Sequence, residues 1–89
     1  MEDVRKGVDL LDRQIIGLLA ERFRYMDAAA RIKPERGMVR DESRKAEVIG
    51  NARRLAAGTM PVHLVEELYD RLVEGSIAYE FERFDATRG

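Results

Sequence analysis

The sequence predicts an all-α fold, in which a single domain over residues 1–89 forms three helices. Three observations support this prediction. Apolar residues recur at spacings of three and four along three segments, which is the helical period. No segment shows the alternation of apolar and polar residues that is typical of a strand. Prolines and glycines at Pro34, Gly37, Gly58 and Pro61 separate the three segments, and these residue types interrupt helices.

The first helix is expected from about Asp3, as its N-cap, to Lys33, because Pro34 disfavours helical backbone in the residue before it. A second apolar row lies beside the main one, so this face can contact more than one neighbouring helix. The spacing of the main row predicts an apolar residue at each position, and Arg22 occupies the one position that is not apolar. This row, the apolar stripe of the first helix, consists of Val4, Val8, Leu11, Ile15, Leu18, Tyr25, Ala29 and Ile32.

The second helix is expected from about Asp41 to Ala57, since Asp41 is a good N-cap and Gly58 a good C-terminal stop. Residues 59–61 then provide a cap and first turn for a third helix that runs to about Phe84. The apolar residues of the third helix also follow the helical period. They are Val62, Val65, Leu68, Tyr69, Leu72, Val73 and Ile77.

The length of the first helix predicts a dimer. About 30 residues make a rod of roughly 45 Å, whereas a compact globule of this chain length has a diameter of roughly 30 Å. The helix therefore extends beyond any globule that its own chain can form, and its apolar stripe continues along the extension. We expect an obligate, intertwined homodimer with a two-fold axis, in which a second chain buries this stripe.

Composition excludes several classes of function. The 16 basic and 17 acidic residues leave a net charge of −1, so there is no bulk attraction for nucleic acid or an anionic membrane. The absence of cysteine excludes disulfides, thiolate metal sites and a thiol nucleophile. His63, the single histidine, is expected at the surface in the first turn of the third helix. Without an apolar leader or a long apolar run, a cytoplasmic location is expected.

Several cations lie on the inward side of the first helix. Lys33 follows Arg22 by 11 residues, which places it about 20° away around the helix and roughly 16 Å along it. Two long cationic side chains can therefore converge on one small anion between them. Arg5 is about 25 Å from Arg22 and cannot share that ligand within one chain. Across an antiparallel dimer it could, because the partner's N-terminal end would lie near this chain's middle.

The other two helices also present polar groups on apolar faces. Ser76 and Glu80 extend a row of the third helix by steps of four, and Asp41 and Arg44 share one face of the second. Taken singly, each residue could pair or reach solvent at an interface, as Arg22 could. Taken together they indicate a binding site, because bundle interiors lined by cations and polar groups form the anion sites of helical proteins.

At these spacings the sequence resembles the small all-helical chorismate mutases and the related isochorismate-pyruvate lyases, across residues 4–84. The resemblance rests on an ordered set of segments rather than on one motif. They are "VRKGVDLLDRQIIGLLAERF" with Arg5, Asp12 and Arg22, "AAARIK" with Lys33, "VRDESR" with Asp41 and Arg44, and "VEGSIAYEF" with Ser76 and Glu80.

The resemblance implies a dimer with two sites, each bounded by the three helices of one chain and the N-terminal end of the partner's first helix. Arg5 of the partner subunit, Arg22 and Arg44 would hold the two carboxylates of the substrate. The expected reaction is the rearrangement of chorismate to prephenate, which breaks one C–O bond and forms one C–C bond in a single pericyclic step. It requires no nucleophile, metal or cofactor.

The remaining residues would assist this step. By the same resemblance, Lys33 and Glu80 would contact the ether oxygen, which gains negative charge in the transition state. Asp41 and Ser76 would help to orient the ring, so that the substrate is held in its compact reactive conformer. Bacterial mutases often have Gln at the position of Glu80, so Glu80 is expected to be protonated when it donates to the ether oxygen.

Lys45 is a second departure, since the mutases commonly carry a Glu there that helps to bind the ring hydroxyl. The "AAARIK" segment and the spacing from Lys33 to Arg44 also resemble the lyase branch, which removes pyruvate from isochorismate. Retention of "VRDESR" favours chorismate mutase as the leading hypothesis. Isochorismate-pyruvate lyase is the alternative. A non-catalytic helical dimer that acts as an interaction module is the second alternative.

Overall fold

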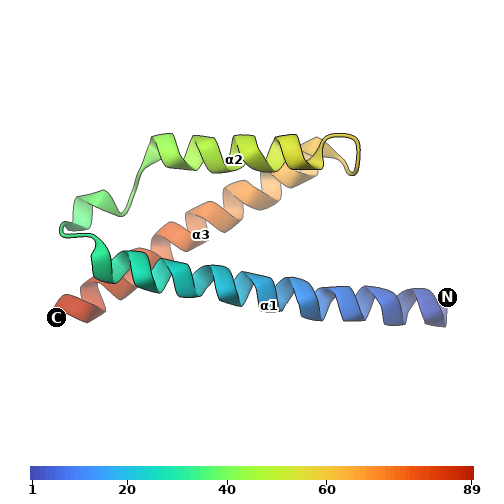
Figure 1. Ribbon diagram of the computed structural model, residues 1–89, viewed down its shortest axis with the longest axis horizontal. Coiled ribbons are helices and arrows are strands. Elements are labelled where there is room, and N and C mark those ends of the chain that lie inside the picture. Colours follow the sequence, from blue (N-terminus) through green and yellow to red (C-terminus); the bar gives the residue numbers. More distant parts are fainter.

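The computed structural model describes all 89 residues as three long helices, one short 3-10 turn and no strand. The elements are α1 (Glu2–Ile32), η1 (Arg36–Met38), α2 (Glu42–Ala56) and α3 (Val62–Arg88). The all-α prediction is therefore confirmed. Helix α3 packs against both α1 and α2, which do not contact each other, and the C-terminal ends of α1 and α3 lie together (Figure 1).

The start of α1 differs from the prediction. Met1 is the N-cap residue and makes no side-chain cap hydrogen bond, so the assignment of Asp3 as N-cap is wrong. Asp3 lies instead in the first turn with Glu2, where carboxylates interact favourably with the positive end of the helix dipole. At the other end, Lys33 is the C-cap in extended backbone, with φ −64° and ψ 127°, because Pro34 follows it.

The predicted signals around α2 are both confirmed. Asp41 is the N-cap, and its Oδ1 accepts a hydrogen bond of 3.0 Å from the backbone N–H of Arg44. Gly58 follows the helix with φ +80°, a conformation that glycine adopts without the steric cost of a side chain. The hydrogen bond at the N-cap therefore fixes the Asp41 side chain relative to the first turn of α2.

Helix α3 begins and ends later than expected. Pro61 is its N-cap and makes no side-chain cap hydrogen bond, and the helix continues one turn beyond Phe84 to Arg88. The Thr59 hydroxyl donates to the carbonyl of Ala56 at 2.9 Å. Thr59 therefore contacts the end of α2 rather than the start of α3.

The core is small and divided, with ten of the 89 residues buried. One apolar cluster joins α3 to the end of α1 and the loop after it, and the other joins α2 to the first part of α3. The first comprises Ala30, Val39, Val73, Ile77 and Phe84, and the second Ala52, Ala56 and Val65. The two clusters correspond to the two packing contacts that α3 makes.

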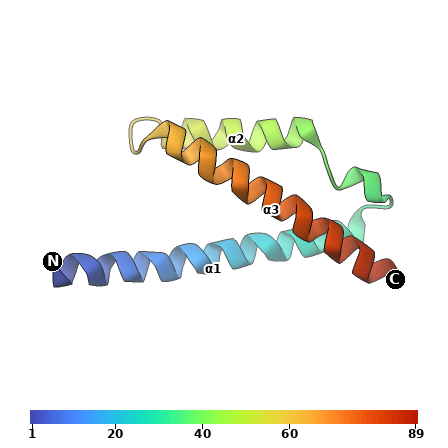
Figure 2. The ribbon, with the colours of Figure 1, turned by 180° about the vertical axis from the view of Figure 1, so that it is seen from behind.

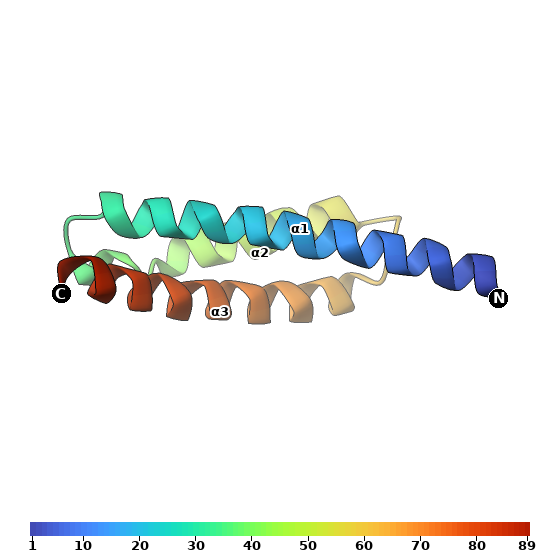
Figure 3. The ribbon, with the colours of Figure 1, turned by 90° about the horizontal axis from the view of Figure 1, so that it is seen from below.

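The molecule is thin and extended. Its radius of gyration is 15.7 Å, against about 12 Å for a compact chain of this length. Its extents are 51 × 24 × 15 Å, and the view from below shows α1 along most of the long axis (Figure 3). No helix combines the length and the hydropathy needed to cross a membrane.

The N-terminal half of α1 projects away from α2 and α3 (Figure 2). Residues of the apolar stripe along this half are each between 51 and 65% exposed: Val4, Val8, Leu11, Ile15 and Leu18. A contiguous exposed apolar surface of this kind marks an interaction site on a soluble protein.

Candidate functional site

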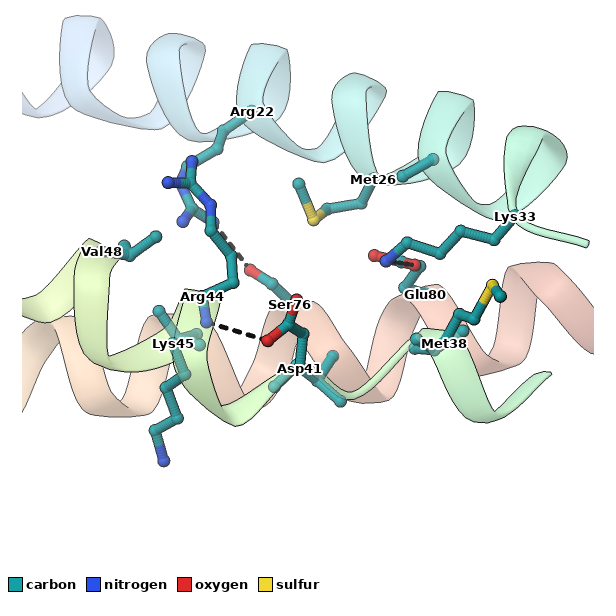
Figure 4. A pocket seen from close by; sticks show the side chains of 14 residues that line it. Arg22, Met26, Lys33, Met38, Asp41, Arg44, Lys45, Val48, Ser76 and Glu80 are labelled. Carbon is teal, nitrogen blue, oxygen red and sulfur yellow. Dashed lines mark hydrogen bonds and ion pairs between the residues drawn. The ribbon is translucent and has the colours of Figure 1, made fainter. Parts of the chain in front are cut away.

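One pocket of about 350 Å³ lies among the three helices and the loop that follows α1 (Figure 4). Six of the seven site residues predicted from the sequence line it, together with the stem of Lys45. These six are Arg22 and Lys33 from α1 and its C-cap, Asp41 and Arg44 from the start of α2, and Ser76 and Glu80 from α3. The remaining lining is largely apolar, as in most small-molecule sites: Met26, Ala29, Met38, Val39, Val48, Val73 and Ile77.

Arg22 projects from α1 toward α3. Its Nη1 donates to the Ser76 hydroxyl at 2.9 Å, and that hydroxyl donates in turn to the Leu72 carbonyl at 2.7 Å. Ser76 is only 3% exposed, so the contact is well defined. The Ser76 hydroxyl carries no charge, so this contact does not neutralise the charge of the guanidinium at the pocket wall.

Lys33 and Glu80 form an ion pair at the opposite end of the pocket. The Lys33 Nζ lies 2.6 Å from Glu80 Oε2, and the Glu80 side chain is 5% exposed. The pair orients the ammonium of Lys33 within the pocket (Figure 4).

Asp41 and Arg44 bring the start of α2 to the pocket. The N-cap hydrogen bond between them fixes the Asp41 carboxylate. The Arg44 side chain extends from α2 toward α1, on the side of the pocket where Arg22 lies (Figure 4). Its Nη1 pairs with Glu47, one turn later on the exposed side of α2. An exposed pair of this type contributes little free energy, so an anion in the pocket can compete with Glu47 for Arg44.

Lys45 points away from the pocket, although its stem lines the wall (Figure 4). Its Nζ lies 2.7 Å from Glu74 Oε2 and 3.1 Å from Asp70 Oδ1, both on α3. The role of Lys45, which the sequence left open, is thus to attach α2 to α3. At this position the pocket presents neither an acid nor a cation, only the alkyl stem.

Glu74, on α3, pairs with two cations near the start of α2, Arg40 and Lys45. It accepts hydrogen bonds from Arg40 at 2.8 and 3.1 Å as well as from Lys45. Arg40 therefore pairs with α3, and it also contacts Glu42 at 2.9 Å. The hydrogen bonds from Arg40 and then from Lys45 lower the pKa of Glu74 to about 2.

This lowered pKa predicts acid sensitivity. Because the folded value lies below the ordinary 4.5, Glu74 stabilises the fold above about pH 4.5, and this contribution is lost as the pH falls toward 2. We expect Glu74→Gln to have a lower urea midpoint than the parent at pH 6. The difference between the two midpoints should narrow as the pH falls below about 4.5 and close near pH 2. Urea titrations at one fixed protein concentration test this, and a constant difference from pH 6 to pH 3 would contradict it.

Two residues considered from the sequence lie outside the pocket. Arg5 is exposed near the start of α1 and does not line the pocket of its own chain. The His63 side chain is 98% exposed, so the predicted surface position is confirmed. No group of three or more histidine, aspartate or glutamate side chains is arranged to hold a metal ion.

Sequence reasoning missed part of the lining. Met38 and Val39 enter the pocket from the loop after α1, where no periodic pattern identifies an inward side chain. Met26 could have been found, because it lies one heptad before Lys33 on the second apolar row of α1. Glu74 gave no signal, since its partners, Arg40 in the loop before α2 and Lys45 in α2, reach it only through tertiary packing.

Comparison with known proteins agrees with this geometry. Residues 4–81 match the family described as chorismate mutase type II. The isochorismate pyruvate lyase of Pseudomonas aeruginosa is 27% identical over 90 aligned residues, which cover 100% of this chain and 89% of that protein. The family match includes all seven predicted site residues, all of α2 and most of α1 and α3. The chain therefore belongs to the chorismate mutase type II family.

Proposed function

We propose that the protein is a homodimeric chorismate mutase, which rearranges chorismate to prephenate in one pericyclic step. The observation that supports this most is the convergence of Arg22, Lys33 and Arg44 on one pocket that Glu80 also lines. A pocket of about 350 Å³ is within the range for small-molecule sites. Three cations around a largely apolar cavity suit a dicarboxylate with a hydrocarbon ring.

The two arginines that line the pocket, Arg22 and Arg44, are assigned to the carboxylates of the substrate. Arg22 keeps an uncompensated charge at the wall, and Arg44 is held only by an exposed pair. Guanidinium groups bind carboxylates through two parallel hydrogen bonds, which fix orientation as well as charge. Such binding holds the substrate in the compact conformer from which the new C–C bond forms.

Lys33 is assigned to the ether oxygen of the C–O bond that breaks. Its ammonium has three N–H donors, and Glu80 accepts one of them. The other two remain available to an oxygen that gains negative charge in the transition state. Because Glu80 holds the ammonium before the substrate enters, little reorganisation is needed when this charge develops.

The dimer is proposed from the exposed apolar stripe of α1. The projecting half of the helix finds no cover within its own chain, and the stripe includes Val4, which precedes Arg5. In an antiparallel two-fold pair, α1 of each chain would cover the other's stripe. That pairing would bring Arg5 of the partner subunit toward the middle of α1, where Arg22 lines the pocket. The partner would then provide the third carboxylate contact.

Isochorismate-pyruvate lyase is the second candidate. It is favoured by the relative from Pseudomonas aeruginosa, whose name states that reaction. It is also favoured by the Lys45 position, where the pocket wall has no acidic group to accept a hydrogen bond from the chorismate ring hydroxyl. The same cations would hold isochorismate, and the same lysine would face the oxygen of the bond that breaks.

The deciding experiment is to incubate the purified protein separately with chorismate and with isochorismate. Substrate loss is followed, and the products are identified by chromatography and mass spectrometry. The proposal expects prephenate from chorismate as the dominant product. Salicylate with pyruvate from isochorismate alone would establish the lyase, and turnover of neither would favour a non-catalytic helical dimer.

A further inference from the structure

Lys33 lies at the end of a helix, although its assigned role requires its ammonium to stay in a fixed position. It is the C-cap of α1, with extended backbone, and it begins the loop that leads to η1. The last four carbonyls of a helix have no partner within the helix, and helix ends fray unless other groups bind them. The position of the Lys33 side chain therefore depends on what holds this end of α1.

Arg88, at the end of α3, binds two of these free carbonyls. Its Nη1 donates to the Ala30 carbonyl at 2.8 Å, and its Nη2 donates to the Lys33 carbonyl at 2.5 Å. One rigid guanidinium thus spans the last turn of α1 from a buried alanine to the C-cap itself. A positive charge at this end also interacts favourably with the negative end of the helix dipole.

The guanidinium is itself fixed by an aromatic ring. The Arg88 Cζ lies 3.7 Å from the centroid of the Phe84 ring, and Phe84 is 7% exposed in the core cluster that also contains Ala30. Stacking on a buried ring restricts the plane of the guanidinium, and a lysine ammonium would lack that restriction. The same last turns of α3 also hold the following loop, because Arg36 forms a two-point pair with Asp85 at 2.9 and 3.2 Å.

We propose that Arg88 is a positioning residue for Lys33. It fixes the backbone of Lys33 on α3, while Glu80, eight residues earlier on the same helix, fixes the ammonium. One helix thus determines both ends of the lysine that faces the breaking bond. The inference rests on the proposed function, since it concerns the group assigned to the ether oxygen.

Kinetics of Arg88→Ala test the proposal. A displacement of the ammonium should affect the transition state more than substrate binding, so we expect kcat to fall about tenfold with a smaller change in KM. Arg88→Lys should recover only part of kcat, because a single ammonium cannot donate to both carbonyls in the fork geometry of a guanidinium. In a Lys33→Ala background, Arg88→Ala should cause no further loss of kcat.

Arg83→Ala is the matched control. Arg83 also joins α3 to α1, through an ion pair of 2.9 Å with Asp27, but it does not contact Lys33. If Arg88 had a merely structural role, Arg88→Ala and Arg83→Ala would lower kcat equally. Each would also lower kcat by the same factor in the parent and in the Lys33→Ala background. That result, or a kcat for Arg88→Ala equal to the parent value, would overturn the proposal.

Hydrogen exchange provides a readout that does not depend on turnover. The Lys33 amide donates to the Ala29 carbonyl at 2.9 Å, and this bond should open more often once Arg88 is removed. We expect faster exchange at residues 30–36 in Arg88→Ala and not in Arg83→Ala. Equal exchange in both variants would overturn the proposal. A parent protein that turns over neither substrate would overturn the proposed function, while the exchange experiment would still decide whether Arg88 holds this segment.

Discussion

Replacement of Lys33 by alanine is expected to lower kcat for chorismate by roughly 150-fold, which corresponds to about 3 kcal/mol of transition-state stabilisation. The reason is the location of its ammonium in the pocket, with two donors free for the ether oxygen. Stopped or continuous assays of chorismate loss measure this directly. Turnover near the parent value would remove Lys33 from its assigned role.

The control for this experiment concerns stability, because Lys33→Ala leaves a buried carboxylate without its ion-pair partner. Glu80 is 4% exposed, and an unpaired charge at such a site is destabilising. Lys33→Met keeps the alkyl stem, and the double variant Lys33→Met with Glu80→Gln removes the buried charge as well. If all three variants fold as dimers and all show the lowered kcat, the decrease is caused by the loss of the ammonium and not by a change in the fold.

Replacement of Arg5 by alanine is expected to lower kcat/KM by about 30- to 150-fold, although Arg5 contacts nothing in the pocket of its own chain. This range corresponds to about 2 to 3 kcal/mol for one charge-assisted contact to a substrate carboxylate. Steady-state kinetics with chorismate measure the loss. The prediction depends on the dimer, because only the partner's Arg5 can reach the pocket.

Lys6 provides the matched control for Arg5. It is the next residue along α1, it is also cationic and exposed, and it lies about 100° away around the helix. Lys6→Ala should retain nearly full activity, and both variants should remain dimers by light scattering. Equal effects of the two substitutions would indicate a general loss of charge at this end of α1. An Arg5→Ala protein with parent activity would contradict a shared site.

Much of the fold could be predicted because the helical period is a local property of the sequence. The apolar stripe of α1, the Asp41 cap and the Gly58 stop each depend on a few neighbouring residues, and the structure has the corresponding helices. The exact ends could not be predicted. Asp3 and Thr59 both suit an N-cap chemically, but α1 already begins after Met1, and the Thr59 hydroxyl binds the Ala56 carbonyl at the end of α2 instead.

The candidate site could be located because polar residues interrupted apolar rows, as Arg22, Ser76 and Glu80 do. Periodicity places each of these residues on the inward face of its helix, and the inward faces of the three helices meet at one pocket. Which side chains pair could not be predicted, since pairing depends on distances between helices. The Lys33–Glu80 contact and the turn of Lys45 toward Glu74 are of this kind, as is the Arg88 contact with the end of α1.

The central claim is that one chain supplies the pocket and the other supplies Arg5. Coexpression of Lys33→Ala and Arg5→Ala chains with different tags tests it most directly. A mixed dimer has one site with both defects and one site with none, because Lys33 and Arg5 of that intact site come from different chains. Purified mixed dimers should recover about half of the parent activity per dimer, although each variant alone is nearly inactive. If the mixed dimers are no more active than the Lys33→Ala and Arg5→Ala homodimers, the shared site is contradicted.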